Sequence, residues 1–501
     1  DVYKRQEFFL EYAVFLRLLC PDIAKDFYEV NDMQPLPAAA RVGTDEKNKM
    51  ADLPVFRLVL TMALPMMLSM MVQALYNIVD SVFIGMLPER DAALQALGYA
   101  YPIQMLLVAL GVGVGIGVNA VLSRALGKGD PEKASAAAGN GYFLMLCGYV
   151  VFLVFGILVL TTGLYFNSCT QNEQIREMGK VYLGICLVVS FGQFFLLIEE
   201  RCLCATGKTG LAMAMQLSGA LTNIVLDPVF IFVFDMGVAG AAVATVLGQC
   251  VSMGIGLWLN LKFNREIRTS FKEMKPRGDI LKAIFKVGLP AIVLQCLQSL
   301  TTLVMQLVFG FLWTGETKDL LVGIYGIYYK LQYFILMLGY GLTNAVLPII
   351  AFNYGRKNRE RVKKAILSAL GIAAVVAVFG TILFECIPEL LLGCFNASSE
   401  TTAAGFSEMS VGVRIIRLTA PSFLFALFNI VLACAFQALG SGVHSMMVAL
   451  LRLLVILMPA CWLFGKFFGI DGLWWGALVA ETIALVYAAI FIVAVYKKKT
   501  A

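Results

Sequence analysis

Apolar runs of about 20 residues, separated by short polar connections, follow one another from residue 56 almost to the end of the chain. About 20 residues is the length that an α-helix needs to cross a hydrocarbon core of about 30 Å. Because backbone groups in lipid must be satisfied internally, such runs predict helices rather than open strands. We predict twelve spans, at about residues 56–83, 93–122, 138–163, 180–200, 211–234, 238–260, 284–312, 320–350, 366–386, 411–435, 443–465 and 471–496.

Composition agrees with a polytopic membrane protein. Of the 501 residues, 60% are hydrophobic and 14% are charged, whereas roughly a quarter of the residues in a soluble domain are charged. The mean hydropathy is +0.81. The net charge of +6 comes from Lys and Arg in the short connections, so it indicates membrane topology rather than nucleic-acid binding.

The single histidine, the scattered cysteines and the absence of a nucleotide-binding motif exclude several kinds of chemistry. His444 is the one histidine, which removes zinc sites, haem ligation and most histidine-based catalysis, and we expect His444 to be structural. The twelve cysteines are scattered and form no metal cluster motif. No GxxxxGK[ST] phosphate loop is present, so ATP is not the direct energy source. We expect neither an enzyme nor a cofactor.

The first 49 residues do not match the rest of the chain. Their apolar stretch, residues 8–20, is interrupted by Glu11 and Arg17 and is too short to span a membrane. We interpret residues 1–49 as a cytosolic tail, a cloning or sequencing remnant, or an interfacial helix, with Met50 as a natural start.

An internal repeat divides the remainder into two halves. Leucine, proline, glutamine and glycine recur at a constant separation of 225 positions, at Leu64, Pro65, Gln73 and Gly85 and again at Leu289, Pro290, Gln298 and Gly310. We therefore predict an all-α membrane protein of two six-helix bundles, an N-lobe at 50–260 and a C-lobe at 284–501, joined by a cytoplasmic linker at 261–283. Six spans per bundle give both bundles the same orientation, related by a pseudo-two-fold axis along the membrane normal, which is a transporter architecture.

Lys and Arg gather in every second connection. They lie at 124–133, 201–208, 262–286 and 356–364 and in the tail at 497–499. The positive-inside rule places this side, and with it both termini, in the cytoplasm.

Ionisable residues inside predicted spans are expensive and mark transport pathways by default. Asp80 lies late in the first span, and Tyr76 shares its helix face one turn earlier. Asp227 lies one turn after Asn223 in the fifth span, and Pro228 leaves a backbone carbonyl without its helical donor. These oxygens suit Na⁺, and the carboxylates can take a proton. The alternatives are that Asp80 only reaches the outer interface and that Asp227 caps a broken helix.

Lys330 in the eighth span is a third candidate. Its neighbours Tyr329 and Gln332 indicate a polar, aromatic patch on a central cavity, and the alternative is a lysine that snorkels to the interface. In contrast, we interpret 199–201 (Glu-Glu-Arg) as a solvated helix end without function.

Small and kink-forming residues indicate helices that pack closely and bend. Glycines occupy alternate positions from Gly111 to Gly117, which favours close helix approach over nucleotide binding. Pro65, Pro228 and Pro290 are candidate hinges.

Several of these segments resemble the MATE family of multidrug and toxic compound extrusion transporters, over about residues 50–497. The resemblance rests on NIVDSVFIG, LGVGVGIGVNAVLSRALGKGD, CATGKTG, TNIVLDP, YKLQYF and LPIIAFNYGRKN. It implies export of organic, often cationic, compounds in exchange for H⁺ or Na⁺. The family's N-lobe cation site maps onto Asp80, Asn223, Asp227 and Thr245, with Tyr76 nearby.

One position departs from the family pattern. Some relatives carry a Glu in the seventh helix as part of a C-lobe cation site, and this chain has Gln298 there, which echoes Gln73 in the first half. A C-lobe cation site of that kind is therefore not expected, and our hypothesis is that Lys330 replaces its electrostatic role.

We expect a secondary antiporter that works by alternating access in a bacterial inner membrane, with small organic molecules and the lipid bilayer as partners, no nucleic acid, and a monomeric state. The same oxygens serve H⁺ and Na⁺, so either ion remains possible. The main alternative is a related flippase for lipid-linked precursors, although the twelve spans and single buried Lys disfavour it. A receptor or channel is a further alternative, which the intramembrane carboxylates disfavour.

Overall fold

The structure, a computed structural model, describes residues 49–268, 271–394 and 407–500. Apart from Lys49, the N-terminal segment whose nature we predicted lies outside these residues. The first half contains α3 (Lys49–Asp52), α4 (Val55–Gly85), α5 (Arg90–Gly127), α6 (Pro131–Thr162), α7 (Leu164–Cys169), α8 (Glu173–Val188), α9 (Phe191–Ala205), α10 (Thr209–Pro228), the π-helical turn η1 (Val229–Val233) and α11 (Gly237–Phe263).

The second half repeats this order. It contains the 3₁₀ turn η2 (Phe271–Met274), α12 (Gly278–Leu312), α13 (Glu316–Gly355), α14 (Arg359–Cys386), α15 (Pro388–Gly393), α16 (Glu408–Thr419), α17 (Ser422–Ala438), α18 (Gly442–Leu450), the π-helical turn η3 (Leu451–Val455) and α19 (Leu457–Thr500).

The helices confirm the twelve-span prediction. Within the described residues, nine helical stretches are long and apolar enough to cross a membrane, and two bent pairs, α8 with α9 and α16 with α17, bring the number to eleven. The last stretch, Gly442–Lys499, is 58 residues long. Because Gly469 interrupts it with a positive φ of 71°, this stretch supplies two spans.

The two halves share irregularities as well as helix order. The bent pairs, with angles of 45° and 51°, are the fourth span of each half. Each fifth span contains a π-helical turn, η1 after α10 and η3 after α18. These matching distortions are what a repeated six-helix unit produces.

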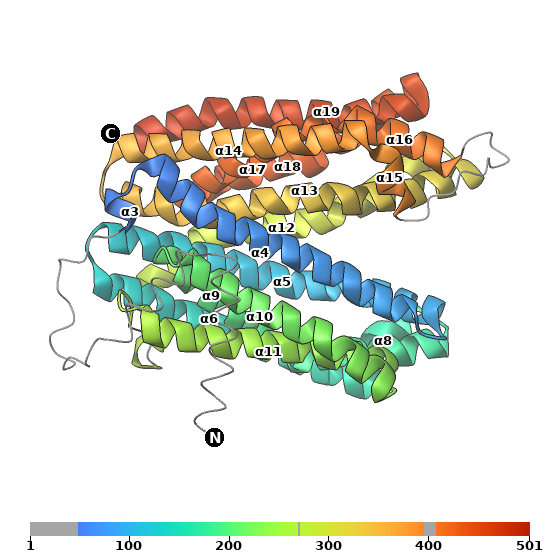
Figure 1. Ribbon diagram of the computed structural model, residues 1–501, viewed down its shortest axis with the longest axis horizontal. Coiled ribbons are helices and arrows are strands. Elements are labelled where there is room, and N and C mark those ends of the chain that lie inside the picture. The colour runs from blue at the N-terminus through green and yellow to red at the C-terminus, as the bar shows by residue number, and fades with distance from the viewer. Residues whose placement is uncertain (1–48, 269–270, 395–406, 501) are drawn as a thin grey trace. The chain divides into compact units, whose positions relative to one another are not determined.

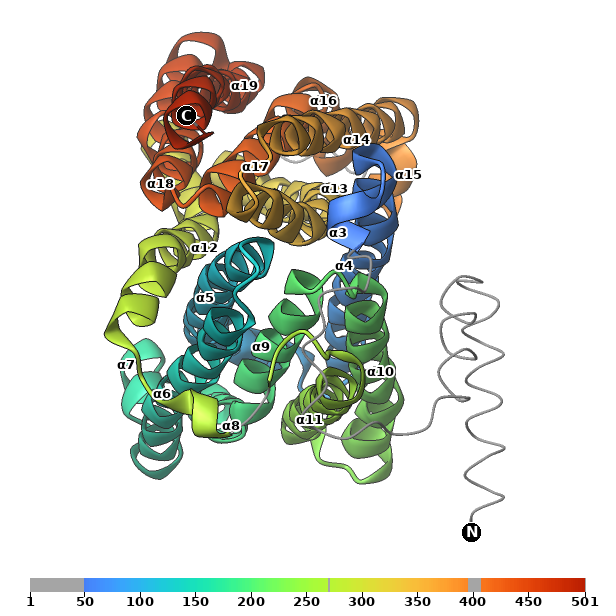
Figure 2. The same cartoon turned by 90° about the vertical axis from the view of Figure 1, so that its left-hand side faces the viewer.

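Figures 1 and 2 show the halves as two helix groups, α5–α11 and α13–α19, with α4 and α12 along the border between them. We call the end where α5 meets α6, where α13 meets α14 and where the C-terminus lies the basic end, on the left in Figure 1. Near this end α4 packs against the second half, since seven of its residues between Val55 and Met67 share a hydrophobic cluster that consists largely of second-half residues. Further along, Ser69 of α4 donates a hydrogen bond to Gln216 of α10, in the first half.

Glycines bring α5 of the first half against α12 of the second. A Cβ atom at Gly113 would lie 2.9 Å from the carbonyl oxygen of Gly288, and one at Gly288 would lie 2.8 Å from that of Gly113. Gly117 faces the backbone of Ile284 in the same way. The alternating glycines thus provide close helix approach, as the sequence predicted.

Polar contacts join the halves at the basic end. The Arg124 guanidinium, from α5, donates to the carbonyl oxygen of Ala438 in α17 at 2.9 Å and lies 5.0 Å from the centre of the Tyr354 ring in α13. With the glycine contacts, this arrangement closes the interface between the halves at this end.

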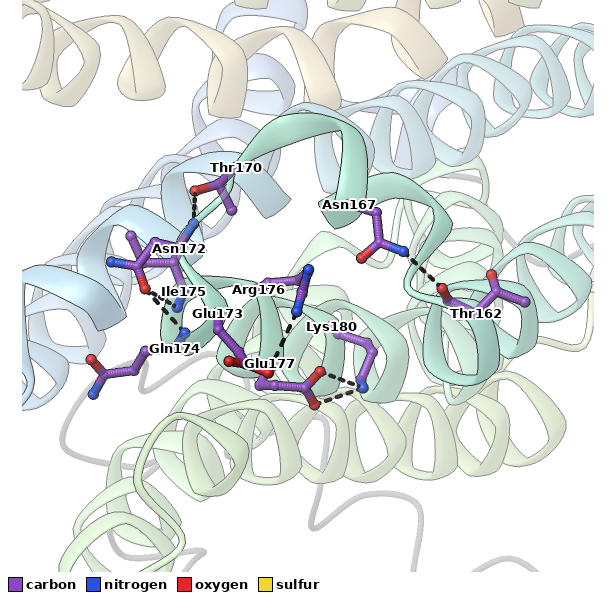
Figure 3. A network of polar contacts seen from close by, with 10 residues as sticks. All are labelled: Thr162, Asn167, Thr170, Asn172, Glu173, Gln174, Ile175, Arg176, Glu177 and Lys180. Carbon is purple, nitrogen blue, oxygen red and sulfur yellow. Dashed lines mark hydrogen bonds and ion pairs between the residues drawn. The ribbon is translucent and has the colours of Figure 1, made fainter.

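At the opposite end, polar side chains fix the turn from α6 to α8 (Figure 3). Asn172 caps α8, because its side-chain oxygen accepts from the backbone N–H groups of Gln174 and Ile175 at 3.0 and 3.4 Å. Arg176 and Lys180 pair with acidic residues of the same helix, so this end gains little net positive charge from them.

Replacing Asn172 by Ala should lower the free energy of unfolding by about 1 kcal/mol, because two backbone N–H groups lose their acceptor. Unfolding in increasing SDS, followed by circular dichroism, measures this change. Gln174→Ala is the control, since that side chain is exposed on the same turn. Equal shifts for the two variants would contradict a capping role.

Candidate functional site

A central cavity of about 390 Å³ lies between the two halves. It is bounded by residues of α4, α5, α8, α9, α10 and α11 from the first half and of α12, α13, α17, α18 and η3 from the second. On α4 its lining runs from Ser69 to Asp80, the part away from the basic end. Arg201 of α9 also lines the cavity, and its Nη1 donates to Asn344 Oδ1 of α13 at 2.6 Å.

Asp227 and Asn223 form the centre of the first-half site. Asp227 is fully buried, with 0% of its surface exposed, and its Oδ1 accepts a hydrogen bond from Asn223 Nδ2 at 3.2 Å. They lie one turn apart on the same face of α10, as the i, i+4 spacing predicted. Asn223 itself lines the cavity, so Asp227 lies directly behind the wall.

Asp80, Tyr76 and Thr245 complete the wall around this pair. All three line the central cavity, two from α4 and one from α11. Asp80 is close enough to Asp227 for their charges to interact, and Tyr76 lies within the same range of both carboxylates. The structure therefore brings Tyr76, Asp80, Asn223 and Asp227 close together, and Thr245 lines the same cavity.

Three oxygen atoms in this cluster are buried without a hydrogen-bond partner among the described residues. They are Asp80 Oδ1, Asn223 Oδ1 and Asp227 Oδ2. Buried polar atoms are rarely left unsatisfied, because each costs about 1–3 kcal/mol. An arrangement of carboxylate and amide oxygens in this state fits a cation or a proton that arrives from the cavity.

Helix packing and a helix distortion position these oxygens. Gly248 of α11 lies against the backbone of Gly219 in α10, where a Cβ atom would be 2.8 Å from the carbonyl oxygen, so the two helices approach closely beside Asn223. Pro228 has no N–H group to continue the α-helical ladder, and the chain continues as the π-helical turn η1.

The predicted substrate-cavity residues divide into two groups. Gln73 and Gln298 line the cavity, and Gln298 donates a hydrogen bond to the hydroxyl of Tyr340. Tyr329, Lys330 and Gln332 are not among the lining residues. On α13 the first residue that lines the cavity is Tyr333, about one helical turn after Lys330. The side chain of Lys330 is exposed and does not line the cavity.

Comparison with known families decides what kind of protein this is. The family model MatE matches residues 65–229 and 290–463, which together make up more than half of the chain and fall on corresponding parts of the two halves. The chain belongs to the MATE family. It is therefore a multi-pass membrane transporter rather than a member of an enzyme class.

Relatives and solved structures agree with this MATE assignment. Multidrug export protein MepA of Staphylococcus aureus is 26% identical over 448 residues, covering 88% of this chain and 94% of that protein. MepA of Staphylococcus haemolyticus is 27% identical over 446 residues, covering 88% and 93%. A structure described as the outward-facing conformation of a multidrug resistance MATE family transporter of the MOP superfamily is 25% identical, with a TM-score of 0.82, and covers 91% of this chain and 100% of that one.

The interpretation of Glu199, Glu200 and Arg201 as a solvated helix end is wrong. All three are buried, with exposed fractions of 1%, 1% and 4%. Asn260 of α11 donates to Glu199 Oε2 at 2.6 Å, and Glu200 and Arg201 line the central cavity. They escape solvent because α9 lies inside the bundle. Glu199 and Arg201 have partners on neighbouring helices, and Glu200 lies 3.8 Å from Arg201.

Sequence reasoning missed a second charged cluster in this MATE transporter. Arg452 of η3, Glu481 of α19 and Asn429 of α17 form a buried hydrogen-bonded group in the second half. The signal was visible, because Arg452 and Glu481 interrupt the last two apolar spans, where ionisable residues are expensive. By contrast, His444 packs against Phe436 and Phe491 and contacts the Tyr487 hydroxyl at 2.9 Å, as a structural residue would.

Proposed function

We propose that this transporter exports organic cations, including drugs and toxic compounds, in exchange for H⁺ or Na⁺ by alternating access. The observation that carries the proposal is the group of three buried oxygens beside the cavity that have no hydrogen-bond partner among the described residues. The names of the relatives support drug export, since they are multidrug export proteins.

Asp80, Asn223, Asp227, Thr245 and Tyr76 are the proposed coupling site. With both carboxylates ionised, the first-half wall of the cavity carries negative charge and attracts a cationic, largely apolar substrate. A proton or Na⁺ at the same oxygens neutralises that charge and weakens the attraction. Substrate and coupling ion therefore exclude one another, which is the requirement for exchange.

The helix α4 is the proposed connection between ion binding and gating. It carries Asp80 and Tyr76 into the first half, and its other end packs in the core of the second half. Pro65 lies inside the helix, within the part that packs against the second half and one turn before Ser69, where the cavity lining begins. We propose that α4 bends near Pro65 when the site is neutralised, with Pro290 and Pro228 as further hinges.

The orientation follows the positive-inside rule. We propose that the basic end faces the cytoplasm of a bacterial cell, with both termini inside, and that the protein works as a monomer. The cavity would then be closed toward the cytoplasm in this structure. The similarity to a transporter described as outward-facing supports this assignment.

Transport by the full chain in liposomes tests the proposal. Ethidium uptake, followed by its fluorescence on DNA trapped inside, should rise several-fold above the rate without a gradient when an opposing H⁺ or Na⁺ gradient is imposed. The gradient that drives uptake identifies the coupling ion. An uptake rate that is the same with and without each gradient would contradict exchange. No ethidium uptake at all would favour the lipid flippase, and lipid substrates would then be tested.

A further inference from the structure

Basic side chains from three helices meet at the basic end, where the two halves are in contact. Arg124 lies in the last turn of α5, Lys286 near the start of α12 and Lys499 near the end of α19. Lys499 interacts electrostatically with both Arg124 and Lys286, so the three positive charges lie close together. We call these three residues the three-cation site, and Figure 2 looks onto the end of the molecule that carries it.

The turn between α17 and α18 lies inside this cluster. Arg124 donates to the carbonyl oxygen of Ala438, and a Cβ atom at Gly440 would lie 2.9 Å from Arg124 Nη2. On the other side of the turn, a Cβ atom at Gly442 would lie 2.8 Å from the carbonyl oxygen of Lys286. Two glycines thus allow the turn to fit between the arginine of α5 and the start of α12.

The positive charges of the site are not compensated by the protein. Among the described residues, none of the three forms an ion pair with a carboxylate. Lys498 adds a further positive charge beside Lys499. Arg124 Nε is buried without a hydrogen-bond partner in the described part of the chain, so the guanidinium is only partly engaged. Like charges at short range repel, and an anion between them removes the repulsion.

Apolar side chains continue from the site into the membrane. Leu289 shares a face of α12 with Lys286, one turn deeper, and 57% of its surface is exposed. Val443 follows the glycine that contacts α12, and it is 61% exposed. Basic residues at the edge of an exposed apolar surface suit the two parts of a phospholipid, its phosphate and its acyl chains. The positive-inside rule accounts for lysines on this side, but it does not require three helices to bring them together.

We propose that the three-cation site binds the phosphate of an anionic phospholipid, and that the bound lipid holds the two halves together at the basic end. Arg124 belongs to the first half, and both lysines belong to the second. A phosphate among them therefore bridges the halves, whereas the bare charges favour separation. The lipid site is independent of the transported compound, and its effect on closure rests on the alternating access proposed above.

Native mass spectrometry of the purified full chain measures the binding. Dioleoyl phosphatidylglycerol is the anionic probe, and dioleoyl phosphatidylcholine, which has no net charge, is the comparison. Wild type should bind the first molecule of phosphatidylglycerol at least about tenfold more tightly than phosphatidylcholine. The double variant Lys286→Gln with Lys499→Gln should weaken phosphatidylglycerol binding by about 25-fold, since each lysine beside an anionic lipid contributes about fivefold.

The matched control is Lys357→Gln with Lys363→Gln. These two lysines are exposed at the same end of the molecule, so the control removes the same charge outside the site. Its affinity for phosphatidylglycerol should stay within about twofold of wild type.

Lys286→Glu tests the effect on closure. A carboxylate at this position supplies the missing negative charge from within the protein, beside Arg124 and Lys499. Nitroxide labels at the exposed residues Lys128 and Arg356, one in each half, report the separation by pulsed electron resonance in nanodiscs. In wild type, replacing phosphatidylglycerol by phosphatidylcholine should raise the population with the longer distance at least about fivefold. Lys286→Glu should keep the shorter distance in both lipids.

Four results would overturn the inference. Equal affinity of wild type for the two lipids, or an equal loss of affinity in the control, would show that the lysines serve topology alone. Displacement of the lipid by an equal concentration of inorganic phosphate would identify a soluble anion as the ligand. A label distance that is the same in both lipids would contradict the bridging role. Ethidium transport that follows an ion gradient in spite of any of these results would leave the proposed function intact.

Discussion

Replacing Asp227 by Asn should reduce gradient-driven ethidium transport at least about 100-fold. Asn keeps the size of the side chain and can still accept the hydrogen bond from Asn223. It cannot take up a proton at neutral pH or neutralise a cation. Losing the charged partner of a buried ion costs about 3–5 kcal/mol, and each 1.36 kcal/mol is a factor of ten in rate.

Asp235→Asn is the matched control for this prediction. Asp235 is exposed beyond the turn η1, and its backbone has a positive φ of 53°, which Asn also tolerates. Its transport rate should stay within about twofold of wild type. If Asp227→Asn retains gradient-driven transport at a similar rate, the coupling ion binds elsewhere. Correct folding of both variants is checked by circular dichroism and by elution as a single species in size-exclusion chromatography.

The span architecture was predictable because the membrane imposes a simple rule on the sequence. The length of each apolar run predicted the number of membrane-spanning helices. Pro, Gln and Gly residues that recur at a constant separation in the sequence indicated the repeat. The bend between α16 and α17 coincides with Pro421, a residue type that marks kinks, whereas the bend between α8 and α9 has no such marker. The bend between α8 and α9 falls inside a continuous apolar run, where hydropathy carries no information about helix direction.

Short-range spacing also located the first-half site. Asn223 and Asp227 lie one turn apart on one helix, so their contact follows from helical geometry. The group formed by Arg452, Glu481 and Asn429 joins three separate helices, and only their packing brings it together. Residues 199–201 were misjudged for the same reason, since consecutive charges look solvated until the partners on α11 and α13 are known.

Because α5 and α12 are in close contact, we expect Gly113 of α5 to be as important for transport as Asp227. The proposed alternating access requires the halves to separate and close again at the basic end. In the closed arrangement a Cβ atom at Gly113 would lie 2.8 Å from the Ile292 backbone nitrogen and 2.9 Å from the Gly288 carbonyl oxygen. These are backbone atoms, which cannot turn aside as the end of a flexible side chain can.

Gly113→Leu should therefore destabilise the closed arrangement and reduce transport by about 5- to 150-fold, since overpacking costs about 1–3 kcal/mol. Each half should still fold, because the clash lies between them. Nitroxide labels at the exposed residues Lys128 and Arg356, in a chain whose cysteines are replaced, should move apart in the variant, as measured by pulsed electron resonance. Gly254→Leu is the control, since nothing lies within 4 Å of a Cβ atom there. An unchanged label distance together with normal transport would show that the halves exchange between their arrangements without this contact.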